Sequence, residues 1–169
     1  MTTKLLTLFA CFMLAAINSF SQQFEVPANV VMDKKEDYAN YDKDVIAAVN
    51  WLEATPIGTD ADKRKSVNAF VMKWINGSPE VTIGITESQI KLFDKNPDFL
   101  LVFMGAYSRY VLQTKDASVL PCYVAAMKSV IAVYKLGGKI KKSKQLTQAS
   151  EANDGGKLED WIKTNMGGN

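Results

Sequence analysis

The sequence predicts an all-α fold, an irregular single-domain helical bundle of about five to seven helices around a central antiparallel helical hairpin. Apolar residues recur at helical spacing along most of the chain. Two stretches, 98–113 and 118–136, are apolar nearly all round, as buried helices are, and a short polar linker joins them. One segment, 80–85, alternates apolar and polar residues with the period of a strand. Because a single strand has no sheet to join, we expect an extended crossover that lies on the core.

Two helices are expected in the first half of the chain. The first follows a periodic apolar pattern from Asp42 onwards and ends before Pro56, because the residue that precedes proline is pushed out of the helical region. The second opens at Thr59. Gly77 ends it, because glycine readily takes the left-handed conformation of a helix stop.

The boundaries of the next three helices are indicated by capping residues. Thr86 and Gln89 have the spacing of a capping box, which predicts a short third helix. Pro97 suits the first position of the fourth helix, because that position needs no backbone N–H. Gly137 and Gly138 end the fifth helix in the same way as Gly77 ends the second.

The chain ends with a basic segment, 139–144, and two short helices separated by the break at 153–156. We expect the last helix, 157–163, to dock through its apolar residues, which are Leu158, Trp161 and Ile162. The lysines of the basic segment could meet anionic lipid or polysaccharide. A charge run of this kind is more typical of a solvated surface, which is the interpretation we favour.

The first residues have the three parts of a secretory signal. A positive charge at Lys4 precedes an apolar run over 5–17, and small residues follow at Ser19 and Ser21. The run is shorter than the ~20 residues that a membrane-spanning helix needs. We therefore expect cleavage before Gln22 and export from the cytoplasm, to the periplasm or the extracellular space.

The expected organisation is a signal peptide over 1–21, an irregular N-terminal arm over 22–40, a helical domain over 41–166 and a flexible tail over 167–169. An alternative for the N-terminus is a lipoprotein signal that ends at Cys11. The apolar run continues past that cysteine, and Phe9 stands where such a signal needs a small residue, so the cleaved signal peptide is favoured.

The composition excludes several classes of function. The chain has no histidine, which removes the usual Ser-His-Asp and Cys-His catalysis and the common catalytic zinc sites. No glycine-rich phosphate loop is present, so no nucleotide cofactor is expected. No metal site is expected either. A formal net charge of +2 argues against nucleic acid as a partner. We expect a soluble product without a transmembrane segment in the exported part.

Two further residue patterns have a possible catalytic interpretation. Cys122 lies in the first turn of a predicted helix, which lowers a thiol pKa, but no base neighbours it, so a packed core cysteine is favoured. Ser88 and Lys91 have the Ser-x-x-Lys spacing of penicillin-recognising enzymes. The two further motifs of those enzymes are absent, so the spacing is attributed to chance.

Arg109 is the most informative single residue, because it interrupts an otherwise apolar helix. A buried guanidinium must be paired, since an unpaired buried charge costs several kcal/mol. The favoured partner is a carboxylate of a neighbouring helix. The alternative is an anion-binding arginine, with the rings of Tyr107 and Tyr110 lining the pocket.

The segments 19–22, 51–56 and 103–110, which read SFSQ, WLEATP and FMGAYSRY, resemble those of a group of short exported bacterial proteins of unassigned function. The resemblance covers most of the chain after residue 21. It implies a helical fold and a location in a Gram-negative envelope or outside the cell. It carries over no functional residues.

Three hypotheses of function follow from these patterns. The first is a non-catalytic binding or interaction module of the cell envelope, whose partner is a protein or a small anionic ligand. The second is a small hydrolase that uses carboxylates. The third is a structural accessory of an envelope assembly.

Overall fold

The computed structural model describes residues 24–167. This part of the chain is 68% helical, with seven α-helices, one 3-10 helix and no strand, which confirms the predicted all-α single-domain bundle. The elements are η1 (Lys35–Tyr41), α2 (Asp42–Ala54), α3 (Ala61–Gly77), α4 (Glu87–Phe93), α5 (Asp98–Thr114), α6 (Val119–Leu136), α7 (Lys144–Asp154) and α8 (Leu158–Asn165).

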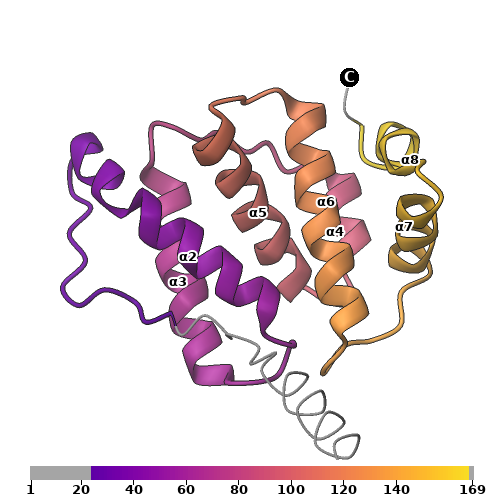
Figure 1. Ribbon diagram of the computed structural model, residues 1–169, viewed down its shortest axis with the longest axis horizontal. Coiled ribbons are helices and arrows are strands. Elements are labelled where there is room, and N and C mark those ends of the chain that lie inside the picture. The colour runs from indigo at the N-terminus through magenta and orange to yellow at the C-terminus, as the bar shows by residue number, and fades with distance from the viewer. Residues whose placement is uncertain (1–23, 168–169) are drawn as a thin grey trace, which may run out of the picture.

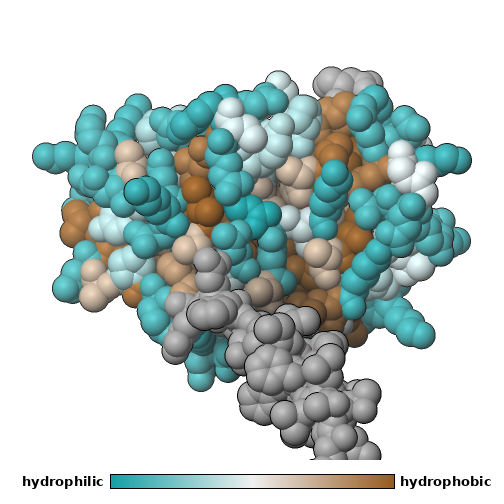
Figure 2. All heavy atoms as spheres, viewed as in Figure 1, coloured by the Kyte–Doolittle hydropathy of each residue, from teal (hydrophilic) through white to brown (hydrophobic). Residues whose placement is uncertain are grey.

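The helices are arranged around α5 and α6, which run antiparallel and share the largest interface of the molecule (Figure 1). The predicted central hairpin is therefore confirmed. Helix α2 packs on α3, α5 and α6, whereas α7 and α8 pack on the other flank of α6. The surface over α2, α5 and α6 is mostly hydrophilic, with hydrophobic atoms visible in patches between the helices (Figure 2).

The core lies where α5 and α6 meet the other helices, because these two helices carry apolar residues on nearly all sides. The rings of Phe103 and Tyr123 meet edge to face, with centroids 5.4 Å apart. Met127 and Val130 are completely buried beside them. Gly105 leaves room for Val49 of α2, since an added Cβ there would lie 3.1 Å from the valine side chain.

Helix α6 is the one helix within residues 24–167 that is long and apolar enough to cross a membrane by length and composition. Its 18 residues have a mean hydropathy of 1.4. The fold accounts for this composition, because α6 packs against α2, α5, α7 and α8. Both properties are those expected of the central helix of a bundle.

The N-terminal arm contributes to the core. Phe24 and Met32 are buried, and η1 covers the end of α3, where the indole of Trp74 donates a hydrogen bond to the carbonyl of Tyr38 at 3.0 Å. The part of the arm before η1 has no regular secondary structure. The predicted signal peptide, residues 1–21, lies outside the described residues.

The crossover between α3 and α4 is extended without being part of a sheet, as its isolated alternation predicted. Val81 is buried and the side chains of Ile83 and Ile85 pack against the core, so every second residue of the segment faces inward. The hydroxyl of Tyr123 donates to the carbonyl of Gly84 at 3.3 Å. The capping box of Thr86 then starts α4 as predicted.

Two predicted helix starts differ in detail from the structure. Helix α3 begins at Ala61, two residues after the predicted Thr59, because Asp60 takes a left-handed conformation with φ 47°. Helix α5 begins at Asp98 and makes no side-chain cap. The side chain of Asn96 bonds instead to the backbone of Lys141.

Candidate functional site

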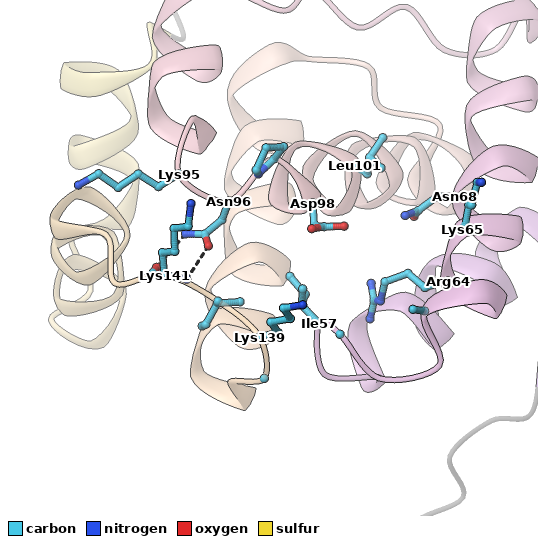
Figure 3. Close-up of a pocket in the computed structure, with 15 residues that line it drawn as sticks. Ile57, Arg64, Lys65, Asn68, Lys95, Asn96, Asp98, Leu101, Lys139 and Lys141 are labelled. Atoms are coloured by element: carbon cyan, nitrogen blue, oxygen red, sulfur yellow. Dashed lines mark hydrogen bonds between the residues drawn. The ribbon is translucent and has the colours of Figure 1, made fainter.

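A cavity of about 740 Å³ lies where three connecting segments meet (Figure 3). These are the α2–α3 connection with the first turns of α3, the α4–α5 connection with the start of α5, and the chain that leaves α6, residues 138–141. Its polar lining residues are Arg64, Lys65, Asn68, Lys95, Asn96, Asp98, Lys139 and Lys141.

Two of these segments are joined by backbone contacts. Ile57 and Gly138 form an isolated parallel bridge, and the N–H of Lys139 donates to the carbonyl of Ile57 at 2.6 Å. Gly138 has φ 104°, and a Cβ at this position would lie 2.4 Å from the Ile57 carbonyl oxygen. Only glycine meets both the conformation and the close approach.

The third segment is attached through Asn96, which is buried. Its amide Nδ2 donates to the carbonyl of Lys141 at 2.8 Å, and its Oδ1 accepts from the N–H of Lys141 at 2.7 Å. The pair of bonds imitates a backbone ladder, so a single side chain holds 138–141 against the start of α5. Lys139 and Lys141 are thereby placed at the cavity (Figure 3).

Arg64 comes from the first turns of α3 and is only 4% exposed. Its Nη2 donates to the carbonyls of Leu52, at 3.1 Å, and Thr55, which lie at the C-terminal end of α2. A cation is favourable there, because the last carbonyls of a helix carry partial negative charge. This part of the guanidinium has a structural role.

The rest of the Arg64 guanidinium is not used by the fold. Its Nε is buried and has no hydrogen-bond partner among the described residues. The guanidinium lies 5.7 Å from the ring centroid of Trp51, a cation–π distance at which the donors other than Nη2 stay unengaged. In Figure 3 the guanidinium points from α3 into the cavity. An anion would satisfy these donors.

Burial lowers the pKa of Arg64, and the charge of Asp98 acts in the opposite direction. An arginine remains charged at any physiological pH, because its pKa starts above 12. The buried guanidinium therefore brings a permanent positive charge to the edge of the cavity.

The charge of the cavity is strongly positive. Its lining includes five cationic side chains, Arg64, Lys65, Lys95, Lys139 and Lys141, and a single carboxylate, that of Asp98. None of the five forms an ion pair with another residue in the described part of the chain. Several unpaired cationic side chains in a concave site attract anions and raise their local concentration.

The residues predicted as a site on α5 have separate hydrogen-bond partners. Arg109 donates from Nη1 to Glu53 at 2.7 Å and to Asn50 at 2.5 Å, and from Nη2 to Ser129 at 3.2 Å. The side chains of Arg109 and Glu53 are 19% and 20% exposed. The carboxylate partner expected from the sequence is thus Glu53 of α2.

The two tyrosines have separate surroundings. Tyr107 is buried against Tyr123, and burial, with Cys122 next to it, raises the pKa of Tyr107 to about 12. The hydroxyl of Tyr110 donates to Asp116 at 3.4 Å, and its ring lines a smaller cavity of about 400 Å³ beside Lys128 and Glu159. A ligand site at Arg109, Tyr107 and Tyr110 stays a prediction.

Groups for other chemistry are not gathered in this part of the structure. Within residues 24–167 no cluster of three or more potential metal ligands occurs. Cys122 is completely buried, and burial raises the pKa of its thiol. Hydrolysis by paired carboxylates needs two of them in one site, and the larger cavity contains one, Asp98.

Sequence reasoning missed the cavity for a physical reason. Arg64 lies in a helix among other charged residues and has no local mark of burial. In the sequence alone, the basic segment 139–144 is typical of a solvated surface. Two of its lysines, Lys139 and Lys141, in fact line the cavity. The signal that could have pointed to them is Gly137-Gly138, which allows the chain after α6 to turn sharply against Ile57.

Comparisons with models of known protein families, with curated proteins and with solved structures gave no significant match. The function is therefore inferred from the geometry of the cavity.

Proposed function

We propose that this protein is an exported, non-catalytic module that binds a small anionic ligand in the cavity lined by Arg64. The observation that carries the proposal is the unpartnered Nε of this buried arginine in a cavity whose lining includes four further cations. A buried donor without a partner costs about 1–3 kcal/mol. An anion that accepts a hydrogen bond from this Nε would remove that cost.

The shape of the cavity supports a ligand and not merely a counter-ion. Its volume of about 740 Å³ falls in the usual range for small-molecule sites. Apolar side chains contribute to the lining as well, in the form of Ile57, Leu101 and Ile140. A mixture of apolar walls and a few polar groups is what orients an organic ligand.

The location is part of the same proposal. A signal peptide over 1–21 would export the chain to the periplasm or beyond, as in the group of short exported proteins that the sequence resembles. A binding module in the periplasm or outside the cell would meet small anions of that compartment.

The proposal is tested by titrating sodium sulfate into the protein at low ionic strength, with isothermal calorimetry as the readout. The variant K139Q/K141Q removes two cations of the cavity. We expect its Kd for sulfate to rise about tenfold, since each exposed charge contributes about 0.7 kcal/mol. Arg64 is left intact in this test, because it also caps α2.

The matched control is K142Q/K144Q, which removes two charges from the same basic segment but outside the cavity lining. Its Kd should change less than about twofold, the effect of screened distant charges. An equal loss of affinity in both double variants would show that sulfate responds to net charge alone. Failure of the unmodified protein to bind any small anion, inorganic or organic, would also contradict the proposal.

A further inference from the structure

The carboxylate of Asp98 is an unexpected group in a cationic cavity. Asp98 is the first residue of α5 and is half-buried. It forms no ion pair with any described residue, although five cations line the same cavity. A negative charge at the start of a helix is favourable, which explains why the fold tolerates it. The helix does not explain why the carboxylate faces the cavity.

Figure 3 shows where the carboxylate lies. Arg64 and Asn68 of α3 are on one side of Asp98, and Asn96 with Lys141 is on the other. An anion that bridges the cations of the two sides would therefore pass over the carboxylate. For an ion that carries only acceptor oxygens, such as sulfate, this approach is repulsive.

A ligand with hydroxyl groups changes the sign of this interaction. A hydroxyl donates to a carboxylate, and a hydrogen bond to a charged acceptor is among the stronger ones. Asn68 lies beside Asp98 and lines the cavity. Its amide can both donate to and accept from a hydroxyl. The cations would hold the acidic group while these two side chains hold the hydroxyls.

We propose that Asp98 makes the cavity select organic anions that carry hydroxyl groups, as a sugar acid or a sugar ester of sulfate or phosphate does, over simple oxyanions. This inference rests on the proposed function. The size of the cavity agrees with it, because about 740 Å³ is far more than one oxyanion fills, and pockets of this volume hold small organic ligands. The cations also lie on both sides of Asp98, on α3 and on 138–141, so a ligand can span the carboxylate.

The test compares two matched pairs of probes of equal charge by calorimetry: methyl sulfate with glucose 6-sulfate, and acetate with glucuronate. The first member of each pair lacks hydroxyls, and the second carries them on a sugar ring. We expect the unmodified protein to bind the sugar member of each pair about tenfold more tightly, the worth of one charge-assisted hydrogen bond.

The variant D98N then separates selection from attraction. Its amide removes the repulsion, so methyl sulfate should bind about threefold more tightly. Glucose 6-sulfate should bind about threefold more weakly, because the tenfold loss of the charged acceptor outweighs the same relief of repulsion. The control D94N changes an exposed aspartate close in sequence but outside the lining, and both affinities should stay as they are.

The outcomes distinguish this inference from the proposed function. If D98N strengthens the binding of methyl sulfate and of glucose 6-sulfate by the same factor, Asp98 only repels anions and the selectivity is wrong, although anion binding stands. Equal affinity of the unmodified protein for both members of each pair overturns the selectivity in the same way. If none of the four probes binds, the proposed function fails together with the inference.

Discussion

Arg109 shows how a charge is accommodated on an apolar helix. Its guanidinium meets the carboxylate of Glu53 and the side chains of Asn50 and Ser129, so α5 is tied to α2 and α6 through one residue. The second carboxylate oxygen of Glu53 is buried without a partner. Glu53 therefore depends on Arg109 more than an exposed glutamate would, because loss of the arginine leaves a charge without compensation.

We predict that Arg109→Ala lowers the free energy of unfolding by about 3 kcal/mol, the lower end of the range for stranding one member of a buried pair. Arg109→Lys should cost less, since it keeps the charge but loses the planar fork that reaches three partners. Urea denaturation of the three proteins measures both losses. A loss below about 1 kcal/mol for the alanine variant, as for an exposed pair, would contradict the prediction.

Arg64 differs from Arg109 although both are largely buried arginines. Arg109 has a carboxylate in contact, whereas Arg64 has two carbonyls at the end of α2 and an Nε without a partner. The difference separates an arginine whose charge is compensated within the fold from one that retains capacity for a ligand. Burial alone does not make this distinction.

At the scale of elements, the chain after α6 determines whether the cavity exists. Gly137 and Gly138 both have positive φ, which turns the chain away from the helix. The turn brings 138–141 against Ile57, and Asn96 holds it there from the opposite side. Two loops and one buried amide thus position the lysines, with no contribution from a regular helix.

We predict that Gly138→Ala is more destabilising than Gly137→Ala. Both substitutions place an alanine at positive φ, which costs about 1–3 kcal/mol. Only the Cβ at position 138 would also lie 2.4 Å from the Ile57 carbonyl, whereas nothing lies within 4 Å of a Cβ at position 137. Thermal unfolding of the two variants isolates the close approach.

The same pair of variants tests the link between the turn and the cavity. Gly138→Ala should also weaken sulfate binding, because the lysines of 138–141 lose their position. Equal melting temperatures and equal sulfate affinities for the two variants would mean that the bridge between Ile57 and Gly138 does not hold the cavity together.

At the scale of the whole molecule, stability depends on one continuous core. Cys122 is the one cysteine within residues 24–167, and it is free and buried. A domain of this length buries enough apolar surface to fold without disulfides or a metal.

The proposed export gives a prediction for the intact chain. Expression of the full sequence in a Gram-negative host should yield a protein whose N-terminal residue is Gln22, because signal peptidase cleaves after small residues such as Ser21. Intact mass spectrometry of the periplasmic fraction measures this. A mass that includes residues 1–21, or one increased by a lipid on Cys11, would contradict it.

The sequence by itself determined the helices and their order. Helical periodicity, the capping box at Thr86 and the prolines and glycines act locally, so they predicted α2 to α6 and the central hairpin almost to the residue. The apolar surroundings of Arg109 in the helix were enough to predict a carboxylate partner, because a helix that is apolar nearly all round is buried and a buried charge needs a partner.

Only the tertiary structure decided the site. The cavity joins residues from three segments that are far apart in the chain: the start of α3, the start of α5 and the chain after α6. Its charged residues Arg64, Asp98 and Lys141 each resemble ordinary surface charges where they stand in the sequence. A charged side chain can pair with another charge, bond to the end of a helix or remain without a partner. Which of these occurs depends on which segments meet in space. That meeting is set by long-range contacts, such as those of Asn96 and Gly138, which have no periodic signal.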